Sequence, residues 1–266
     1  MNCFANAKRI VIKVGTSTLT YETGSVNIRR VEHFVKVLSD LANSGKEVIL
    51  VTSGAISVGA SKLGWRERPS DTPGRQAAAA VGQLELMYIY DNLFSKYNHA
   101  VAQVLLTKDV VDDELKRRNV INTFQRLLLH GAIPIINEND TVSVEELEGG
   151  NIGDNDTLSA IVAELTEADA LVIMSDFEGL FDDNPRTNPN AKLIPLVEHV
   201  DDYIESVATG SGSNRGTGGM STKIQAAKIM ENAGIDMAIV SGSNPDCLYD
   251  LFDGKPVGTH FVFSRN

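Results

Sequence analysis

The sequence predicts an α/β fold, a three-layer αβα sandwich in which helices cover both faces of a central, mostly parallel sheet. Short runs of β-branched and apolar residues recur along the chain, and several end in small polar residues. Helical patterns lie between these runs, as the crossover connections of parallel strands require. The chain has 266 residues, of which 42% are hydrophobic, so it is long enough for a sizeable core. We expect one domain over residues 1–266.

Two strands near the start of the chain end in small-residue turns. The run from Arg9 to Val14 is followed by Gly15, and the run from Glu47 to Thr52 is followed by Ser53 and Gly54. In a doubly wound sheet, such strand ends form the edge that binds ligands. We therefore expect a ligand site at the carboxyl edge of this sheet.

Lys13 is the unusual residue of the first strand. A lysine is costly in a strand that is apolar on both faces unless its ammonium leaves the core or meets an anion. Lys13 is therefore either a residue whose side chain extends to solvent or a ligand-binding group at the mouth of the strand. The turn that follows it favours the binding role.

The helices are predicted from their caps and apolar stripes. Asn27 is expected to cap a helix that is closed by Gly45, and Thr72 to cap a long helix that has Pro73 at its first position and continues through Phe94. In that helix an alanine run at 77–80 indicates close helix packing. The other predicted helices cover 55–64, 112–130, 158–165, 201–207 and 224–230, and the other strands 100–106, 132–136, 170–174, 237–240 and 260–263.

A glycine-rich segment at 215–223 is the strongest indication of ligand binding. It reads Arg-Gly-Thr-Gly-Gly-Met-Ser-Thr-Lys and leads into a helix, which places hydroxyls, a lysine and free N–H groups together. Glycines allow φ > 0 and let the backbone approach a ligand closely. The segment predicts a phosphate site, although it is not a Walker A loop, because no Ser or Thr follows Lys223. The alternative is an ordinary flexible loop.

Acidic clusters and an aromatic loop add candidate ligand groups. One cluster ends at Asp140, and a second contains Asp154, Asn155 and Asp156. Turn and capping chemistry explains most such clusters. Beside a phosphate site, Asp140 and Asn155 are candidates for the amine and carboxylate of an amino acid, while Asp154 or Asp156 orients a cation or lysines. The loop at 177–186 either covers an adenine or is a surface hairpin.

Composition argues against several classes of function. The net charge of −11 is opposite to that of a nucleic-acid or anionic-membrane surface, so any phosphate site must be locally basic. Cys3 and Cys247 match neither disulfide nor zinc spacing, and the five histidines have no metal spacing. The sequence shows no secretory signal and no run of about 18 apolar residues. We expect a cytoplasmic protein without nucleic-acid or membrane partners.

Five motifs, in this order along nearly the whole chain, resemble the glutamate 5-kinase family of the amino acid kinase superfamily. They lie at 11–17, 52–55, 135–140, 153–156 and 216–223. The resemblance implies the amino acid kinase fold and transfer of a phosphoryl group from ATP, with Mg²⁺, to the side-chain carboxylate of L-glutamate. The product, γ-glutamyl phosphate, is the first intermediate of proline biosynthesis. Many members carry a C-terminal PUA domain, which we expect this chain to lack because it stops just past the kinase domain.

The resemblance also implies roles for individual residues. Lys13 and Lys223 bracket the phosphoryl group, and Asp156 positions both lysines. Glutamate binding is implied for Ser53, Gly54, Asp140 and Asn155, and ATP binding for Lys13, Ser175, Asp176, Thr217, Gly218, Gly219, Met220, Ser221, Thr222 and Lys223. The metal ligands are not specified, and Mg²⁺ is expected to be held mainly by ATP phosphates.

The motifs leave the partners of the chain open, and they leave rival activities to be considered. The resemblance leaves open a homo-oligomer and functional coupling to glutamate-5-semialdehyde dehydrogenase. Rivals are an acetylglutamate kinase, an aspartokinase, and a non-catalytic nucleotide or amino-acid sensor on the same fold. The presence of both lysines and both acidic clusters weighs against the sensor.

Overall fold

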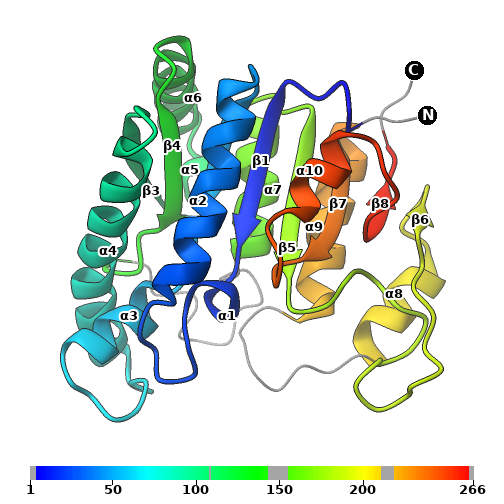
Figure 1. Cartoon of the computed structure of the whole chain (residues 1–266), viewed down its shortest axis with the longest axis horizontal. Coiled ribbons are helices and arrows are strands. Elements are labelled where there is room, and N and C mark those ends of the chain that lie inside the picture. Colours follow the sequence, from blue (N-terminus) through cyan, green and yellow to red (C-terminus); the bar gives the residue numbers. More distant parts are fainter. Residues whose placement is uncertain (1–3, 108, 143–154, 211–218, 264–266) are drawn as a thin grey trace. The chain divides into compact units, whose positions relative to one another are not determined.

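The computed structural model describes residues 4–107, 109–142, 155–210 and 219–263 (Figure 1). The chain divides into two compact units. We call residues 14–153 the inner unit, and residues 1–13 with 154–266 the terminal unit. Each unit combines parallel strands with helices, which confirms the predicted α/β class.

The inner unit has three strands in the order β3-β4-β2. Strand β4 runs parallel to both neighbours, with Ile135 opposite Leu50 of β2 and Ile136 opposite Val104 of β3. Helices α2 and α4 lie on one face of these strands and α6 on the other (Figure 1). The elements are α1 (Thr16–Leu19), α2 (Ile28–Asn43), β2 (Glu47–Val51), α3 (Ala55–Lys62), α4 (Thr72–Ser95), β3 (Val101–Leu106), α5 (Asp109–Asp112), α6 (Glu114–Leu129) and β4 (Ile133–Glu138).

The terminal unit has five strands in the order β1-β5-β7-β8-β6. Strand β7 is parallel to β5 and antiparallel to β8. Helices α7 and α9 lie on one face, and α10 lies on the other (Figure 1). The elements are β1 (Arg9–Val14), α7 (Asn155–Leu165), β5 (Ala170–Ser175), β6 (Leu196–Val197), α8 (Asp202–Gly210), α9 (Met220–Ala233), β7 (Asp236–Ser241), α10 (Cys247–Phe252) and β8 (Thr259–Phe261).

Helix caps agree with the sequence at α2 and differ at α4. Asn27 caps α2 as predicted, because its Oδ1 accepts a hydrogen bond from the N–H of Arg30 at 3.1 Å. Helix α4 is capped by Asp71, whose carboxylate accepts from the N–H of Gly74 at 2.9 Å. The prediction of Thr72 as the cap was therefore wrong by one residue.

Two further boundaries differ from the prediction. The helix expected over 112–130 corresponds to α6, which begins at Glu114 because the carboxylate of Asp113 caps the N–H of Lys116 at 3.0 Å, and the short helix α5 precedes it. The strand expected over 132–136 continues to Glu138, since β4 stays paired with β3 to that point. Two residues of the first acidic cluster therefore belong to a strand.

Helices α3 and α4 pack with their backbones in contact, as the alanine run predicted. A Cβ added at Gly59 would overlap the carbonyl oxygen of Ala78, and one added at Gly82 would overlap that of Ala55. Both helices therefore need glycine at the crossing. Because Ala55 is the first residue of α3, this packing fixes the start of α3 directly after Gly54.

Candidate functional site

Three charged residues from distant parts of the sequence meet in the terminal unit. Lys13 lies near the end of β1, Asp156 in the first turn of α7, and Lys223 in the first turn of α9. The Nζ of Lys13 lies 2.6 Å from Oδ1 of Asp156, and the Nζ of Lys223 donates to Oδ2 at 2.9 Å. We call these three residues the lysine bridge.

The lysine bridge is almost fully buried. Asp156 is 0% exposed and each lysine is 5% exposed. This burial contradicts the alternative in which the Lys13 side chain extends to solvent. One carboxylate between two ammoniums leaves a net charge of +1, a local excess of positive charge in a chain of net charge −11. The bridge is thus a candidate for the locally basic site that a phosphate ligand would need in this chain.

The surroundings of Asp156 keep it ionised. Burial acts to raise the pKa of its carboxyl, but the ammoniums of Lys13 and Lys223 outweigh burial and hold the pKa well below its usual range. The first turn of α7 also favours a carboxylate, since helix N–H groups there are not used within the helix. The Oγ1 of Thr222 lies 2.9 Å from Oδ2 of Asp156 and donates to it.

The start of α9 supplies backbone donors beside the lysine bridge. Gly219 is its N-cap and has no capping side chain, so the N–H groups of the first turn are suited to an anion. The φ angle of Gly219 is −79°, so this glycine does not use the left-handed conformation that its lack of a Cβ allows. Met220, Ser221, Thr222 and Lys223 form the first turn of α9. The predicted residues Asp154, Thr217 and Gly218 lie outside the described residues.

The end of β5 carries two more predicted ATP residues. Ser175 is buried, and its carbonyl accepts from the N–H of Gly242 at 2.6 Å. Asp176 forms an ion pair with Arg186, with Oδ2 and Nη2 separated by 2.6 Å. The guanidinium of Arg186 also lies 4.5 Å from the ring centroid of Phe177. Sequence reasoning missed Arg186, although a lone arginine in an acidic loop was a usable signal.

The loop after β5 adjoins the start of α9. It has hairpin character, because Phe181 and Leu193 form an antiparallel bridge. It also borders the predicted nucleotide segment, since Met220 lines a small cleft together with this loop. The loop residues in the cleft are Phe177, Gly179, Leu180, Phe181, Asp183 and Pro185. The loop expected either to cover an adenine or to be a surface hairpin is therefore a neighbour of the predicted phosphate segment within the terminal unit.

The residues assigned to glutamate lie on both units of the chain. In the inner unit, Ser53 and Gly54 follow β2, and Asp140 follows β4. Gly54 caps α3 with φ of 99°, a left-handed conformation that favours glycine. Asn155 is the first residue of α7 in the terminal unit, directly before Asp156.

Asp140 has an unusual electrostatic environment within the inner unit. Burial and repulsion from Glu138 raise the pKa of its carboxyl to about 6, against a smaller lowering by Arg75 and Arg68. A partly buried carboxylate of this kind gains from a cationic partner. Sequence reasoning missed both arginines; Arg75 in the first turn of α4 could have been suspected, because a basic residue there is disfavoured by the helix dipole.

The described residues do not form a metal-binding cluster. No group of three or more His, Cys, Asp or Glu side chains among them is arranged to hold a metal ion. An ion at the lysine bridge would meet two ammoniums that already share the nearby carboxylate. A Mg²⁺ ion that arrives with a nucleotide would therefore depend mainly on phosphate oxygens.

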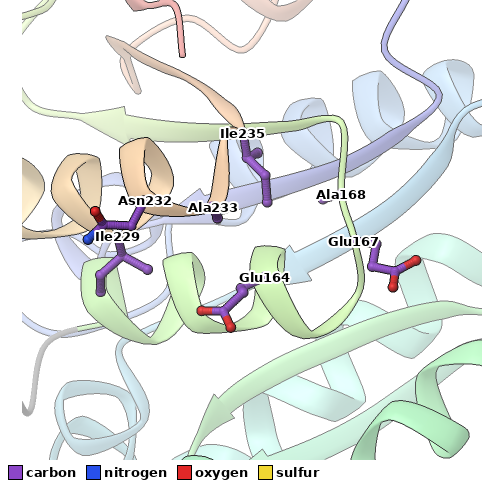
Figure 2. A pocket seen from close by; sticks show the side chains of 7 residues that line it. All are labelled: Glu164, Glu167, Ala168, Ile229, Asn232, Ala233 and Ile235. Carbon is purple, nitrogen blue, oxygen red and sulfur yellow. The ribbon is translucent and has the colours of Figure 1, made fainter. Parts of the chain in front are cut away.

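A surface pocket of about 590 Å³ lies elsewhere in the terminal unit (Figure 2). Its lining residues come from the C-terminal ends of α7 and α9 and the residues that follow them: Glu164, Glu167, Ala168, Ile229, Asn232, Ala233 and Ile235. Glu164 follows Asp156 by eight residues, about 12 Å along the helix. The pocket contains no predicted site residue and no cation, so the chemistry locates the candidate site at the lysine bridge.

Comparison of the sequence with known proteins gives evidence on the family of this chain that is independent of the site geometry. The model of the amino acid kinase family matches residues 8–241. A curated relative from Clostridium perfringens (strain 13 / Type A), named glutamate 5-kinase, is 53% identical over 98% of this chain and 97% of its own length. A relative of the same name from Listeria innocua is 52% identical over 98% of this chain and 95% of its own length.

Solved structures share the fold at low sequence identity. A UMP kinase from Bacillus anthracis has a TM-score of 0.64 at 19% identity, with 97% of both chains covered. A carbamate kinase from Giardia lamblia bound to AMP-PNP has a TM-score of 0.65 at 15% identity, with 97% of this chain and 99% of that chain covered. These two similarities concern the fold alone.

Proposed function

Because the chain belongs to the amino acid kinase family, we propose that it transfers the γ-phosphoryl group of ATP to the side-chain carboxylate of L-glutamate. The product is γ-glutamyl phosphate, and the reaction is the first step of proline biosynthesis. The lysine bridge is the observation that carries this proposal, since it offers two fixed ammoniums to a phosphoryl group. The identity of about half of all residues to glutamate 5-kinases supports glutamate as the acceptor.

The reaction needs little acid–base chemistry from the protein. An oxygen of the glutamate carboxylate forms a bond to the γ-phosphorus, and the bond from that phosphorus to the bridging oxygen breaks to leave ADP. The attacking carboxylate is already ionised at neutral pH, so it needs no general base. Catalysis then consists of positioning and of stabilising negative charge in the transition state.

Lys13 and Lys223 supply that stabilisation. Both ammoniums are held by opposite oxygens of Asp156, so their positions are set before the phosphate arrives. Fixed charges of this kind stabilise a transition state without the cost of reorganising solvent. Asp156 acts as the positioning residue, and its ionisation is secured by the two lysines.

The remaining site residues keep the roles that the family resemblance implies. In the terminal unit, Ser175, Asp176 and the segment 217–223 bind ATP, and the shared cleft at Met220 supports this. Glutamate is bound by Ser53, Gly54, Asp140 and Asn155. The charge of Asp140 suits the α-ammonium of the amino acid, and the N–H groups at the start of α3 suit a carboxylate.

Further proposals concern the setting of the reaction. Mg²⁺ is bound with ATP, and its chemistry is to neutralise phosphate charge. The family model spans residues of both units, which supports a single kinase domain over residues 1–266. No helix in the described part of the chain is long and apolar enough to cross a membrane. A cytoplasmic location, a homo-oligomer and coupling to glutamate-5-semialdehyde dehydrogenase stay predictions.

An ATP-consumption assay tests the proposal directly. The full chain is incubated with ATP and Mg²⁺, and with L-glutamate, N-acetyl-L-glutamate, L-aspartate or no acceptor. We expect ADP release that depends on L-glutamate, with hydroxylamine trapping the acyl phosphate as a hydroxamate. Turnover with N-acetyl-L-glutamate or L-aspartate instead assigns a different amino acid kinase activity, and no acceptor-dependent turnover contradicts the kinase assignment.

A further inference from the structure

A buried hydrogen bond connects α4 with the end of β4 in the inner unit. Gln83 of α4 is 8% exposed, and its Oε1 accepts from Nδ2 of Asn137 at 2.9 Å. The Oδ1 of Asn137 in turn accepts from the N–H of Glu138 at 2.9 Å. Because the Asn137 oxygen is used by an N–H donor, its nitrogen must face Gln83, and the orientation of both amides follows from their partners.

Helix α4 also contacts the end of β2. The hydroxyls of Tyr90 and Thr52 lie 2.9 Å apart in the core, directly before Ser53. Gly82 packs against the backbone of Ala55, the residue after Gly54. One helix therefore fixes the residues on both sides of the predicted glutamate-binding turn, although none of the residues assigned to glutamate lies on this helix.

The segment that carries Asp140 is held in the same way. The N–H of Asn139 donates to the carbonyl of Leu106 at 2.8 Å, and the hydroxyl of Thr141 donates to Oδ1 of Asn139 at 2.6 Å. At the start of this segment, the amide pair of Gln83 and Asn137 is a side-chain contact to α4. The pairing of β4 with β3 and these bonds hold the backbone of the segment, and the amide pair adds a side-chain connection from α4 to its start.

We propose that Gln83 is a positioning residue for Asp140, acting through Asn137, and that it sets the affinity for the amino-acid acceptor. The inference rests on the proposed function, in which Asp140 binds glutamate. Gln83 fixes the Asn137 side chain, Asn137 fixes the N–H of Glu138, and the backbone then leads over two residues to Asp140.

The energetics of Gln83 agree with a positioning role. Among the described residues, its Nε2 is buried and makes no hydrogen bond. A buried donor without an acceptor costs stability, so an apolar side chain of similar size would suit the core at least as well. The glutamine therefore contributes through the orientation of Asn137 and little through its own burial.

The test uses Gln83→Leu, Asn137→Ala and the double variant in the full chain, with Leu86→Val as the matched control. Leu86 is buried one turn further along α4, so its truncation loosens the same helix without touching the amide pair. Steady-state kinetics give kcat and both KM values, and thermal unfolding reports stability.

We expect Gln83→Leu to raise the glutamate KM about tenfold while the ATP KM changes less than about twofold. Its Tm should stay within about 3 °C of the wild type, since the unmet donor of Gln83 is removed while the buried amide of Asn137 loses one acceptor, and these two changes oppose each other. In the double variant the glutamate KM should equal that of Asn137→Ala, because Gln83 then has nothing left to orient. Leu86→Val should lower Tm and leave the glutamate KM unchanged.

Three results overturn the inference. The first is a glutamate KM of Gln83→Leu within about twofold of the wild-type value. The second is a glutamate KM that rises as much in Leu86→Val as in Gln83→Leu. The third is a double variant whose rise in glutamate KM is the product of the rises in Gln83→Leu and Asn137→Ala. Failure of the proposed function is seen separately, because it removes glutamate-dependent turnover from the wild type itself. If Asn137→Ala does not fold, the glutamate KM of Gln83→Leu is compared with that of Leu86→Val, and this comparison alone tests the inference.

Discussion

Replacing Asp140 by Asn should stabilise the protein and impair glutamate binding at the same time. Burial and Glu138 raise the pKa of the Asp140 carboxyl from 3.8 to about 6. A group whose pKa is raised on folding favours the folded state fully below pH 3.8 and loses that contribution as the pH rises through about 6. At pH 7 the ionised Asp140 therefore destabilises the ligand-free protein.

The size of the effect follows from the pKa difference. The rise in the pKa of Asp140 from 3.8 to about 6 corresponds to a loss of folding stability of about 3 kcal/mol at pH 7. For a chain of this length, 1 kcal/mol shifts Tm by about 2–4 °C, so Asp140→Asn should raise Tm by about 6–12 °C. The gain should fall to about half at pH 5, where the wild-type carboxyl is mostly protonated when folded.

Binding should change in the opposite direction. The neutral amide keeps the shape of the side chain but cannot pair with the α-ammonium of glutamate, so the glutamate KM should rise more than tenfold, in line with about 2–5 kcal/mol for a broken buried charge pair. The ATP KM should barely change. In the wild type, the glutamate KM should also rise as the pH falls below about 6.

Thermal unfolding at pH 5 and pH 7, with steady-state kinetics at pH 7, checks both parts. Asp91→Asn on an exposed position of α4 is the matched control, because it removes the same charge from the chain and should shift Tm little. A Tm for Asp140→Asn that is unchanged or lower at pH 7 refutes the electrostatic reasoning. A normal glutamate KM refutes the binding role.

Three further predictions concern the lysine bridge and the acceptor. Lys13→Ala or Lys223→Ala should lower kcat by about 10²-fold or more with a smaller change in ATP KM, and steady-state kinetics with a kcat within threefold of wild type would remove that lysine from the mechanism. Asp156→Asn should cost about 3–5 kcal/mol in denaturant unfolding at pH 7, because two buried ammoniums lose their carboxylate. Asp156 has a lowered pKa, so this stabilisation is present above pH 3.8 and lost as the pH falls below it; equal stability of variant and wild type at pH 7 contradicts the argument. N-acetyl-L-glutamate should be rejected by several orders of magnitude in kcat/KM, since it lacks the ammonium that Asp140 pairs with, and comparable values for both acceptors would move the assignment to acetylglutamate kinase.

The sequence alone determined the fold class and most of the local structure. Strand runs such as 9–14 were predictable because buried parallel strands need β-branched residues, and the cap at Asn27 because its side chain bonds locally. The alanine run of α4 also indicated close helix packing, and the fold showed that the partner is α3. These features depend on residues close together in the chain, so a local pattern records them.

The site depended on tertiary structure wherever its groups come from separate elements. No local pattern connects Lys13, Asp156 and Lys223, and the family resemblance was needed to relate them before the fold showed their contacts. On α4, apolarity favours Leu84 as a core residue, yet Leu84 is 73% exposed and Gln83 is 8% exposed. Gln83 is buried because Asn137, 54 residues later, supplies a hydrogen-bond partner. Only the folded chain brings such a partner within reach, and the partner decides whether a polar side chain can be buried.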